Sequence, residues 1–415
     1  MNDDRAVLVG AGERRHVAEL GRLAATLGMD VAGVLEQNRL DGTGYVGRGK
    51  REELRGLVED VGASFVVADD ELTASQARVL EKAVGATVVD RTELIIRIFE
   101  AHARDAASRL EVELADLEYR LPRVKGRNPE LSRLGGGTVL ARGPGEQQLE
   151  YDRRAIRRRM QTINRKLEHE RAARAVRGAR LKKEGPPTVA LVGYTNAGKT
   201  TILNALSGAG RSTKDRLFET VETTTRLVER TRGEGEDGTH PDFVVTDTVG
   251  FIRKLPTQLV HSFASTLEAA RDADVRVVCA DASSEELEDE IRTVRNTPAE
   301  TLANGNGSAP GATILCLNKM DLVSDERAAE LRKGYPEAVP ISALEGCEAL
   351  LEEIYGLIAS GRERMEVFIP HAEYAAVSRL YGFAEIHAQE NTASGLWMDV
   401  SLPRAALARY APYRV

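Results

Sequence analysis

Short apolar runs alternate with amphipathic stretches through about the first hundred residues of the chain. Four of these runs have the length and composition of β-strands, at residues 7–9, 31–35, 64–68 and 87–89. The stretches between them have the apolar spacing of helices. Because strands that alternate with helices favour a parallel sheet with helical crossovers, we expect an N-terminal parallel α/β domain over residues 1–98.

A glycine-rich, basic stretch, Gly42–Lys50, interrupts this first region. It does not follow a strand directly, and it does not fit the fingerprint of a dinucleotide-binding loop. We interpret it as a flexible surface loop, and a phosphate contact is the alternative.

Long helices replace the alternation from about residue 92. The stretch 126–146 contains two glycine-rich triplets, which cannot continue a helix, so we expect a loop there. An apolar stripe at helical spacing lies on each side of it: Leu110, Leu114, Leu117 and Leu121, then Leu149, Ile156, Met160, Ile163 and Leu167. Two helices with one stripe each predict an antiparallel helical hairpin over residues 99–184.

The segment Gly185-Pro186-Pro187 ends the second long helix, because proline cannot continue it. Strand-like runs then recur, with helical stretches between most of them, at residues 188–192, 243–246, 275–280, 314–317 and 339–341. This alternation predicts a second, doubly wound α/β sheet over residues 185–361.

The tail over residues 362–415 has a different order of elements. It reads as strand, helix, strand, strand and helix, at residues 365–369, 373–381, 384–389, 396–402 and 404–410. This order predicts a small α+β domain at the C-terminus.

The composition is that of a chain with a buried core, since 42% of the 415 residues are hydrophobic and 29% are charged. No apolar stretch approaches the ~20 residues of a membrane-spanning helix, and the first residues do not resemble a secretion signal. We therefore expect a cytoplasmic protein. The cysteines are odd in number and far apart, which favours reduced core thiols over disulfides or a zinc site: Cys279, Cys316 and Cys347.

Charge is distributed unevenly along the chain, whose formal net charge is −7. Between Tyr151 and Lys183 there are thirteen basic and three acidic residues, a net charge of +10 that leaves −17 for the remainder. Such polarisation is typical of an element that contacts a polyphosphate backbone. We expect the hairpin to bind RNA, with candidate contacts at Arg142, Arg153, Arg154, Arg157 and Arg158. The alternative is a coiled-coil spacer whose arginines are solvated.

A phosphate-binding loop lies between the strand at 188–192 and a helical stretch. In this pattern, backbone N–H groups hold phosphates at a helix N-terminus, and the residues concerned are Gly193, Tyr194, Thr195, Asn196, Ala197, Gly198, Lys199, Thr200 and Thr201. We expect Lys199 to neutralise the β- and γ-phosphates and the Thr200 hydroxyl to bind Mg²⁺. An ordinary glycine-rich turn is the alternative.

A second motif, composed of Asp247, Thr248, Val249 and Gly250, follows the strand at 243–246. A carboxylate at this end of a strand can hold Mg²⁺ through water, and the Gly250 N–H can bind the γ-phosphate. Without the phosphate-binding loop, the motif would be an ordinary aspartate-initiated turn.

The residue types that guanine needs come after the last two strands: Asn318, Lys319, Met320 and Asp321, then Ser342, Ala343 and Leu344. Asp321 can accept hydrogen bonds from N1–H and N2–H of guanine, while Asn318 and the Lys319 stem frame the base. The loop at Ser342 can offer a backbone N–H to the guanine carbonyl. Adenine would leave the carboxylate unpaired, at a cost of ~1–3 kcal/mol or more. The order of these motifs predicts a GTP-binding site.

A threonine-rich stretch, residues 217–226, lies where the first switch of such a site belongs. One threonine hydroxyl should reach Mg²⁺ only when the γ-phosphate is bound. The local chemistry does not choose among Thr220, Thr223 and Thr224, and a threonine-rich edge strand is the alternative interpretation.

Taken together, the motifs resemble those of the HflX GTPases, which are related to Obg and Era. The resemblance rests on residues 193–200, 218–222 and 247–251, on Gly135-Gly136-Gly137 and on the run RGPGEQQLEYDRR at 142–154. It covers the chain from the first strand to about residue 360. It implies an α/β domain, a helical hairpin and a G domain. It also implies GTP-dependent binding to the large ribosomal subunit and splitting, rescue or recycling of ribosomes under stress.

The resemblance also selects Thr220 as the switch threonine, inside a nucleotide-binding segment of Phe218, Glu219, Thr220, Val221 and Glu222. The family has Phe-Ala-Thr-Leu-Asp there, so the threonine is kept while alanine, leucine and aspartate are replaced. This interpretation makes Lys199, Thr220 and Gly250 the catalytic residues. It makes Thr200 and Thr220 ligands of Mg²⁺, with Asp247 acting through water.

Phe251 follows Gly250, where Ras-like proteins place the glutamine that orients the attacking water. Because an apolar ring cannot do this, we expect slow intrinsic hydrolysis that the ribosome accelerates. One alternative is an RNA-binding or ribosome-assembly scaffold whose turnover is incidental. Another is an ATP-driven RNA remodeller, but the N-terminal region has no phosphate-loop motif. We expect a monomer with no membrane partner.

Overall fold

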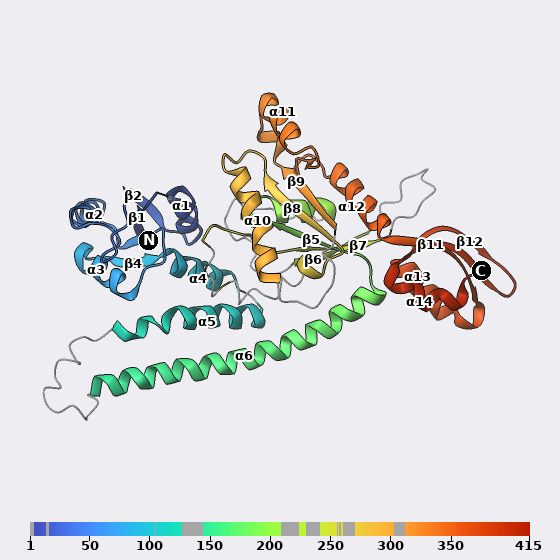
Figure 1. The fold of residues 1–415 in the computed structure, drawn as a ribbon, viewed down its shortest axis with the longest axis horizontal. Coiled ribbons are helices and arrows are strands. Elements are labelled where there is room, and N and C mark those ends of the chain that lie inside the picture. The colour runs from blue at the N-terminus through green and yellow to red at the C-terminus, as the bar shows by residue number, and fades with distance from the viewer. Residues whose placement is uncertain are drawn as a thin grey trace. The chain divides into compact units, whose positions relative to one another are not determined.

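The computed structural model describes residues 4–13, 16–103, 105–126, 144–208, 224–229, 241–254, 256, 259, 270–302 and 312–415. Contacts group the chain into two compact units, one chiefly of residues up to Glu170 and one chiefly of residues from Arg171 onward. The elements of both units are labelled in Figure 1. Within the described ranges, no helix has the length and apolar character needed to span a membrane.

The first unit begins with a four-stranded parallel sheet, in the order β2-β1-β3-β4. Figure 1 labels three of these strands, β1, β2 and β4. Val7 and Val9 of β1 pack in one cluster with Leu54 of α2 and Leu80 of α3. The predicted parallel α/β arrangement is therefore confirmed. Its elements are β1 (Arg5–Ala11), α1 (Val17–Thr26), β2 (Asp30–Gln37), α2 (Arg48–Val61), β3 (Phe65–Ala68), α3 (Ala74–Val84), β4 (Thr87–Asp90) and α4 (Arg91–His102).

The glycine-rich stretch after β2 is a packed turn rather than the flexible loop that the sequence suggested. The backbones of Asp41 and Tyr45 exchange two hydrogen bonds of 2.9 Å. The Tyr45 side chain is buried, and its hydroxyl donates to Asp70 (2.9 Å) and accepts from the N–H of Ala11 (3.2 Å). The sequence pattern did not indicate this packed turn, because the stretch is rich in glycine and a single aromatic residue, Tyr45, anchors it.

A helical hairpin follows, made of α5 (Ala106–Arg120), the 3₁₀ turn η1 (Arg123–Gly126) and the long helix α6 (Pro144–Glu184), as Figure 1 shows. The two apolar stripes meet as predicted, with Leu114 of α5 in one cluster with Ile163 and Leu167 of α6. Glu113 and Arg159 add a bidentate ion pair, with N–O distances of 2.6 and 2.7 Å.

The loop of this hairpin ends earlier than expected, because α6 already begins at Pro144. Proline fits the first turn of a helix, where a backbone N–H has no partner inside the helix. The predicted glycine-rich tip, including Gly135 to Gly137, lies outside the described residues.

The second unit contains a six-stranded sheet in the order β10-β9-β8-β5-β7-β6. All neighbouring strands are parallel except β6 and β7, which are antiparallel. The described elements are β5 (Thr188–Gly193), α7 (Lys199–Leu206), β6 (Thr224–Val228), β7 (Phe243–Asp247), β8 (Val275–Asp281), α10 (Leu287–Leu302), β9 (Ala312–Asn318), η2 (Met320–Leu322), α11 (Asp325–Gly334), β10 (Val339–Pro340) and α12 (Glu348–Ser360).

Strand β6 is a correction to the sequence prediction, which assigned five strands to this sheet. Its residues, Thr224–Val228, belong partly to the threonine-rich stretch, so the edge-strand alternative holds for them. Only Val228 is buried among its five residues, and the burial of an edge strand is too weak to give a clear apolar pattern.

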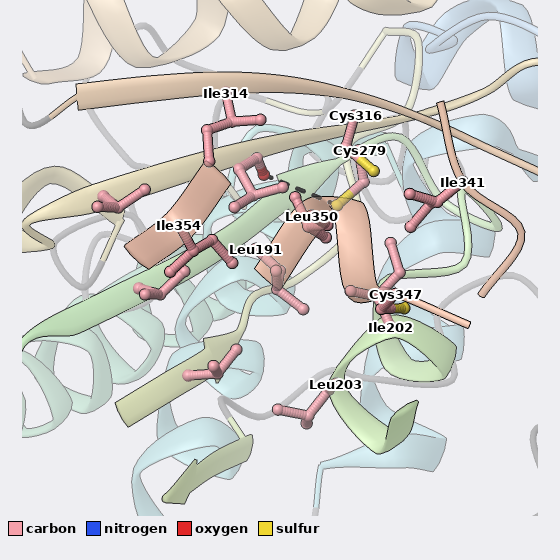
Figure 2. Packing of buried hydrophobic residues seen from close by; sticks show 14 of the residues in the cluster. Leu191, Ile202, Leu203, Cys279, Ile314, Cys316, Ile341, Cys347, Leu350 and Ile354 are labelled. Carbon is pink, nitrogen blue, oxygen red and sulfur yellow. Dashed lines mark hydrogen bonds between the residues drawn. The ribbon is translucent and has the colours of Figure 1, made fainter. Parts of the chain in front are cut away.

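All three cysteines lie in the hydrophobic core of this sheet. In Figure 2, Cys279 and Cys316 lie side by side, and Cys347 lies beside Ile202. Cys279 of β8 and Cys316 of β9 are register partners, and Cys347 precedes α12. The same cluster contains Leu191 of β5 and Leu350 of α12 (Figure 2). The cysteines are free and buried, which confirms the prediction of reduced core thiols.

These thiols should be unreactive in the folded protein. Burial raises the pKa of Cys279 to about 12 and that of Cys347 to about 11. Because the folded protein favours the neutral thiol, this preference contributes fully to stability at pH values below the pKa of cysteine in the unfolded chain, about 8.5. This contribution is lost as the pH rises through the folded values. At pH 8 we expect an aromatic disulfide reagent to label no thiol in the native protein and three in urea. Rapid labelling of the native protein would contradict this burial.

The C-terminal part of the second unit is a three-stranded antiparallel sheet, in the order β11-β13-β12. Two helices cover one face of it, where Val367, Met398 and Val400 form a core with Leu380 and Tyr410. The order of elements matches the predicted α+β tail: β11 (Arg362–Pro370), η3 (His371–Glu373), α13 (Tyr374–Phe383), β12 (Glu385–Asn391), β13 (Gly395–Pro403), α14 (Arg404–Tyr410) and η4 (Ala411–Tyr413).

Candidate functional site

The predicted phosphate-binding loop joins β5 to α7 at the carboxyl end of the parallel strands. Asn196 and Gly198 adopt left-handed backbone conformations, with φ of 65° and 85°. A Cβ atom at Gly198 would lie 2.2 Å from Nδ2 of Asn318, and one at Gly193 would lie 2.3 Å from the carbonyl oxygen of Cys279. Both glycines are therefore required for the close packing of the loop, which leads into the N-terminus of α7, where anions bind.

Lys199 is buried in this loop, with 6% of its surface exposed. Its Nζ donates to the carbonyl oxygens of Gly193 (3.2 Å) and Tyr194 (2.9 Å). Desolvation lowers the pKa of Lys199, and the charge of Asp247 acts in the opposite direction. Phosphate groups above the loop would give this ammonium group the counter-charge that its surroundings supply only in part.

The Thr200 and Asp247 side chains meet beside the loop. The Thr200 hydroxyl donates to Oδ2 of Asp247 at 2.7 Å, and Asp247 is fully buried at the end of β7. Oxygen donors of this kind fit Mg²⁺, which binds few protein ligands and keeps phosphate and water oxygens as the others. Among the described residues there is no cluster of three or more His, Cys, Asp and Glu side chains that could hold a metal ion.

The segment after β7 lies directly against the phosphate-binding loop. The N–H of Phe251 donates to the carbonyl of Gly193 (3.0 Å), and the N–H of Thr195 donates to the carbonyl of Phe251 (2.8 Å). The Tyr194 hydroxyl accepts from the N–H of Arg253 at 2.7 Å. A Cβ atom on Gly250 would lie 2.7 Å from Cγ2 of Thr195, so glycine is required at this contact.

Asn318 holds the nucleotide loops together. Its Nδ2 donates to the carbonyl of Ala197 at 2.9 Å, and its Oδ1 accepts from the N–H of Ala343 at 3.0 Å. The side chain is 2% exposed, so its amide is committed to the protein. The sequence suggested that Asn318 frames the base, whereas the structure shows that it fixes the two loops on either side. Asp321, by contrast, is exposed and available to a ligand.

Asp281, at the end of β8, is a site residue that the sequence motifs did not identify. Its Oδ2 lies 2.7 Å from Nζ of Lys319, and its Oδ1 accepts from the N–H of Ser283 at 3.0 Å. Lys319 has a left-handed backbone, with φ of 65°. The ion pair is mostly buried, with 23% and 17% of the two side chains exposed. Asp281 therefore fixes the stem of Lys319 in a strained turn.

Replacing Asp281 with asparagine should weaken the binding of GDP and inosine diphosphate by the same factor, about tenfold. The amide keeps an acceptor for Ser283 but releases the Lys319 stem, which we expect to pack against the base without reading its 2-amino group. Titration calorimetry of both nucleotides measures the effect. Glu330→Gln, in an exposed ion pair with Arg327, is the matched control. A loss confined to GDP would show instead that Asp281 acts on the edge of guanine.

Several predicted site residues lie outside the described part of the chain. They are Phe218, Glu219, Thr220, Val221, Glu222, Thr223 and Arg142. The other candidate switch threonine, Thr224, is the first residue of β6.

The remaining candidate RNA contacts lie on α6 of the first unit. Arg154, Arg157 and Arg158 are exposed, and Arg153 is partly buried. Within the described part of α6, Nε of Arg154 forms an exposed ion pair with Glu150 at 3.0 Å. The helix thus presents at least two exposed arginines to solvent, a feature that suits a phosphate backbone.

Models of three protein families match consecutive parts of the chain. They are described as GTP-binding GTPase N-terminal (residues 14–100), GTP-binding GTPase Middle Region (residues 102–180) and 50S ribosome-binding GTPase (residues 188–319). The last of these matches covers the phosphate-binding loop and Asn318, so the family model and the geometry identify the same site.

Curated relatives match nearly the whole chain. GTPase HflX of Caldanaerobacter subterraneus subsp. tengcongensis is 40% identical over 376 residues, which are 89% of this chain and 84% of the relative. GTPase HflX of Lacrimispora saccharolytica is 34% identical over 402 residues, which are 96% and 92% of the two chains. The chain belongs to the HflX family of GTPases. It is therefore a GTPase, with GTP as its substrate, as the predicted order of motifs indicated.

A third relative, GTPase HflX of Alkalihalophilus pseudofirmus, is 42% identical over 331 residues, which are 78% of this chain and 75% of the relative. Family membership gives the site its reaction, the hydrolysis of GTP to GDP and phosphate. Lys199, Thr200, Asp247 and Gly250 lie together at one end of this HflX site, where the sequence predicts phosphate binding. Asn318 joins the phosphate-binding loop to the loop at Ala343.

Proposed function

We propose that this HflX GTPase depends on Mg²⁺, binds the large ribosomal subunit in its GTP state and acts in the splitting, rescue or recycling of ribosomes under stress. We also propose that it acts in the cytoplasm as a monomer. The observation that carries the ribosomal part is the exposed arginine surface of α6, in a segment with a net charge of +10. The family description 50S ribosome-binding GTPase supports the same partner.

The proposed organisation follows the sequence pattern. Residues 1–98 form the N-terminal α/β domain, residues 99–184 the hairpin, residues 185–361 the G domain and residues 362–415 the C-terminal domain. The hairpin would contact ribosomal RNA through Arg142, Arg153, Arg154, Arg157 and Arg158, since guanidinium groups pair well with phosphate oxygens.

In the nucleotide site, each residue would have a separate task. Backbone N–H groups from Asn196 to Thr201 would hold the phosphates, and Lys199 would neutralise the charge on their β and γ oxygens. Asp321 would read the guanine edge. Thr200 and, in the GTP state, Thr220 would hold Mg²⁺, with Asp247 acting through water. When bound, the metal supplies positive charge to the phosphate oxygens.

The contact between Phe251 and the phosphate-binding loop suggests how nucleotide state could control attachment. In the structure, the N–H of Phe251 donates to the carbonyl oxygen of Gly193. A γ-phosphate that recruits the N–H of Gly250 would move this segment, and Thr220 would join the metal at the same time. Both segments would then take their GTP-bound arrangement only with the third phosphate, and hydrolysis would release them.

Turnover measurements test the proposed partner. We expect slow hydrolysis by the isolated protein and an increase of at least about tenfold with purified large subunits, because Phe251 brings no polar group to the reaction. A fast rate that large subunits do not change would contradict the proposal.

Salt dependence tests the arginine surface. Replacing Arg154, Arg157 and Arg158 with glutamine should weaken binding to large subunits and reduce the slope of log affinity against log salt by about two to three, one unit for each lost phosphate contact. A matched control replaces three exposed arginines of the second unit with glutamine: Arg292, Arg327 and Arg332. Equal slopes for wild type and the α6 variant would show that these arginines do not contact RNA.

A further inference from the structure

Thr195, the third residue of the phosphate-binding loop, carries a buried hydroxyl group to which the described residues offer no hydrogen-bond partner. The residue is 6% exposed, and its Oγ1 is enclosed without a described donor or acceptor in reach. The backbone N–H of Thr195 is already bonded to the carbonyl of Phe251. Burying an unpaired hydroxyl costs free energy, so a threonine here is explained best by a partner that arrives with the ligand.

The surroundings of Thr195 locate that partner. A Cβ atom on Gly250 would lie 2.7 Å from Cγ2 and 2.9 Å from Cα of Thr195, and 3.1 Å from Nζ of Lys199. Thr195, Lys199 and Gly250 therefore lie together in the site. The methyl group of Thr195 faces Gly250, and the hydroxyl is carried by the same Cβ atom. Lys199 is the cation of the phosphate-binding loop, and Gly250 ends the turn that begins at Asp247, the carboxylate that would act on Mg²⁺ through water. We therefore assign this point to the third phosphate and not to the base.

The reaction at this point lacks a polar side chain in the usual place. Phe251 occupies the position of the water-orienting glutamine, is 4% exposed, and has no side-chain donor or acceptor. In hydrolysis, a water oxygen forms a bond to the γ-phosphorus while the bond from this phosphorus to the β,γ-bridging oxygen breaks. The bond's electron pair stays on GDP, and the protons of the water pass to the phosphate products and solvent.

We propose that Thr195 is a catalytic residue of this HflX GTPase. Its hydroxyl donates a hydrogen bond to an oxygen of the γ-phosphoryl group while that group is transferred to water. Charge spreads over these oxygens in the transition state, so a donor fixed by a packed loop stabilises it more than the bound substrate. The hydroxyl exchanges no proton with the substrate. It gives the γ-phosphoryl group a hydrogen-bond donor from the phosphate-binding loop, which the apolar ring of Phe251 cannot provide.

This inference rests on the GTPase activity of the family and not on the proposed ribosomal partner, so it is tested on the isolated protein. Thr195→Val replaces the hydroxyl with a methyl group of similar size, and Thr195→Ser keeps the hydroxyl. The rate is measured in a single turnover with GTP, which removes product release from the comparison. GDP affinity and the melting temperature are measured for each variant. The matched control, Thr293→Val, removes a surface hydroxyl from α10, where it bonds to the carbonyl of Asp289.

The proposal predicts that Thr195→Val lowers the single-turnover rate by about 10-fold to 100-fold while GDP affinity stays within about twofold of wild type. Thr195→Ser should recover the rate to within about threefold, and Thr293→Val should leave it unchanged. The proposal is overturned if Thr195→Val hydrolyses GTP at the wild-type rate. It is also overturned if GDP affinity and rate fall together in Thr195→Val and Thr195→Ser, because the side chain would then only support the loop.

Discussion

Replacing Asp321 with asparagine should lower the affinity for GTP by about 100-fold or more and create a preference for xanthosine triphosphate. The exposed carboxylate of Asp321 can accept from the N1–H and N2–H groups of guanine, whereas an amide opposes one of these donors with a donor of its own. Xanthine carries a carbonyl oxygen in place of the 2-amino group and therefore accepts from the amide. Competition of both triphosphates against a labelled nucleotide measures the change.

Asp325→Asn is the matched control for this exchange, since Asp325 is an exposed carboxylate in the first turn of α11. It should leave both affinities unchanged. If Asp321→Asn kept its preference for GTP, the guanine-reading role of Asp321 would be refuted, and the base would have to be read by another group.

Replacing Lys199 with methionine should reduce GTP affinity by at least about 100-fold and abolish measurable hydrolysis, because the phosphates lose a charged hydrogen-bond donor. The fold should tolerate the change. Burial lowers the pKa of Lys199, which shows that the charge is costly in the absence of phosphate, and methionine has a similar volume. We expect the melting temperature without nucleotide to stay within about 4 °C of wild type.

Calorimetry of GTP binding and a phosphate-release assay check this second prediction. Lys333→Met, an exposed lysine in the last turn of α11, is the control. Tight GTP binding by Lys199→Met would mean that the backbone of the loop, and not Lys199, supplies most of the binding energy.

The sequence predicted the architecture well where one physical rule dominates. Buried parallel strands such as β5 and β8 leave continuous apolar runs, and the stripes of α5 and α6 leave a helical period. The phosphate-binding loop is equally clear, since its glycines, lysine and threonine have a fixed spacing within the eight consecutive residues 193–200. Each of these features is defined by residues that are close together in the sequence, so a sequence pattern can reveal it.

Features that depend on distant partners were missed. Asp281 meets Lys319 across 38 residues, and the Tyr45 hydroxyl meets Asp70 across 25, so neither contact leaves a local pattern. The predicted role of Asn318 was incomplete for the same reason, because its hydrogen-bond partners Ala197 and Ala343 lie on other loops. Sequence motifs thus identified residues that gather at the site, but the hydrogen bonds among these residues are seen only in the folded structure.

The central claim is that the third phosphate of GTP controls attachment to the large ribosomal subunit. Its most direct test is the dissociation constant for purified large subunits, measured at one salt concentration with saturating non-hydrolysable GTP analogue and with saturating GDP. The account predicts binding at least about tenfold tighter with the analogue, within the usual range of coupling between two sites. Equal dissociation constants in the two nucleotides would contradict it.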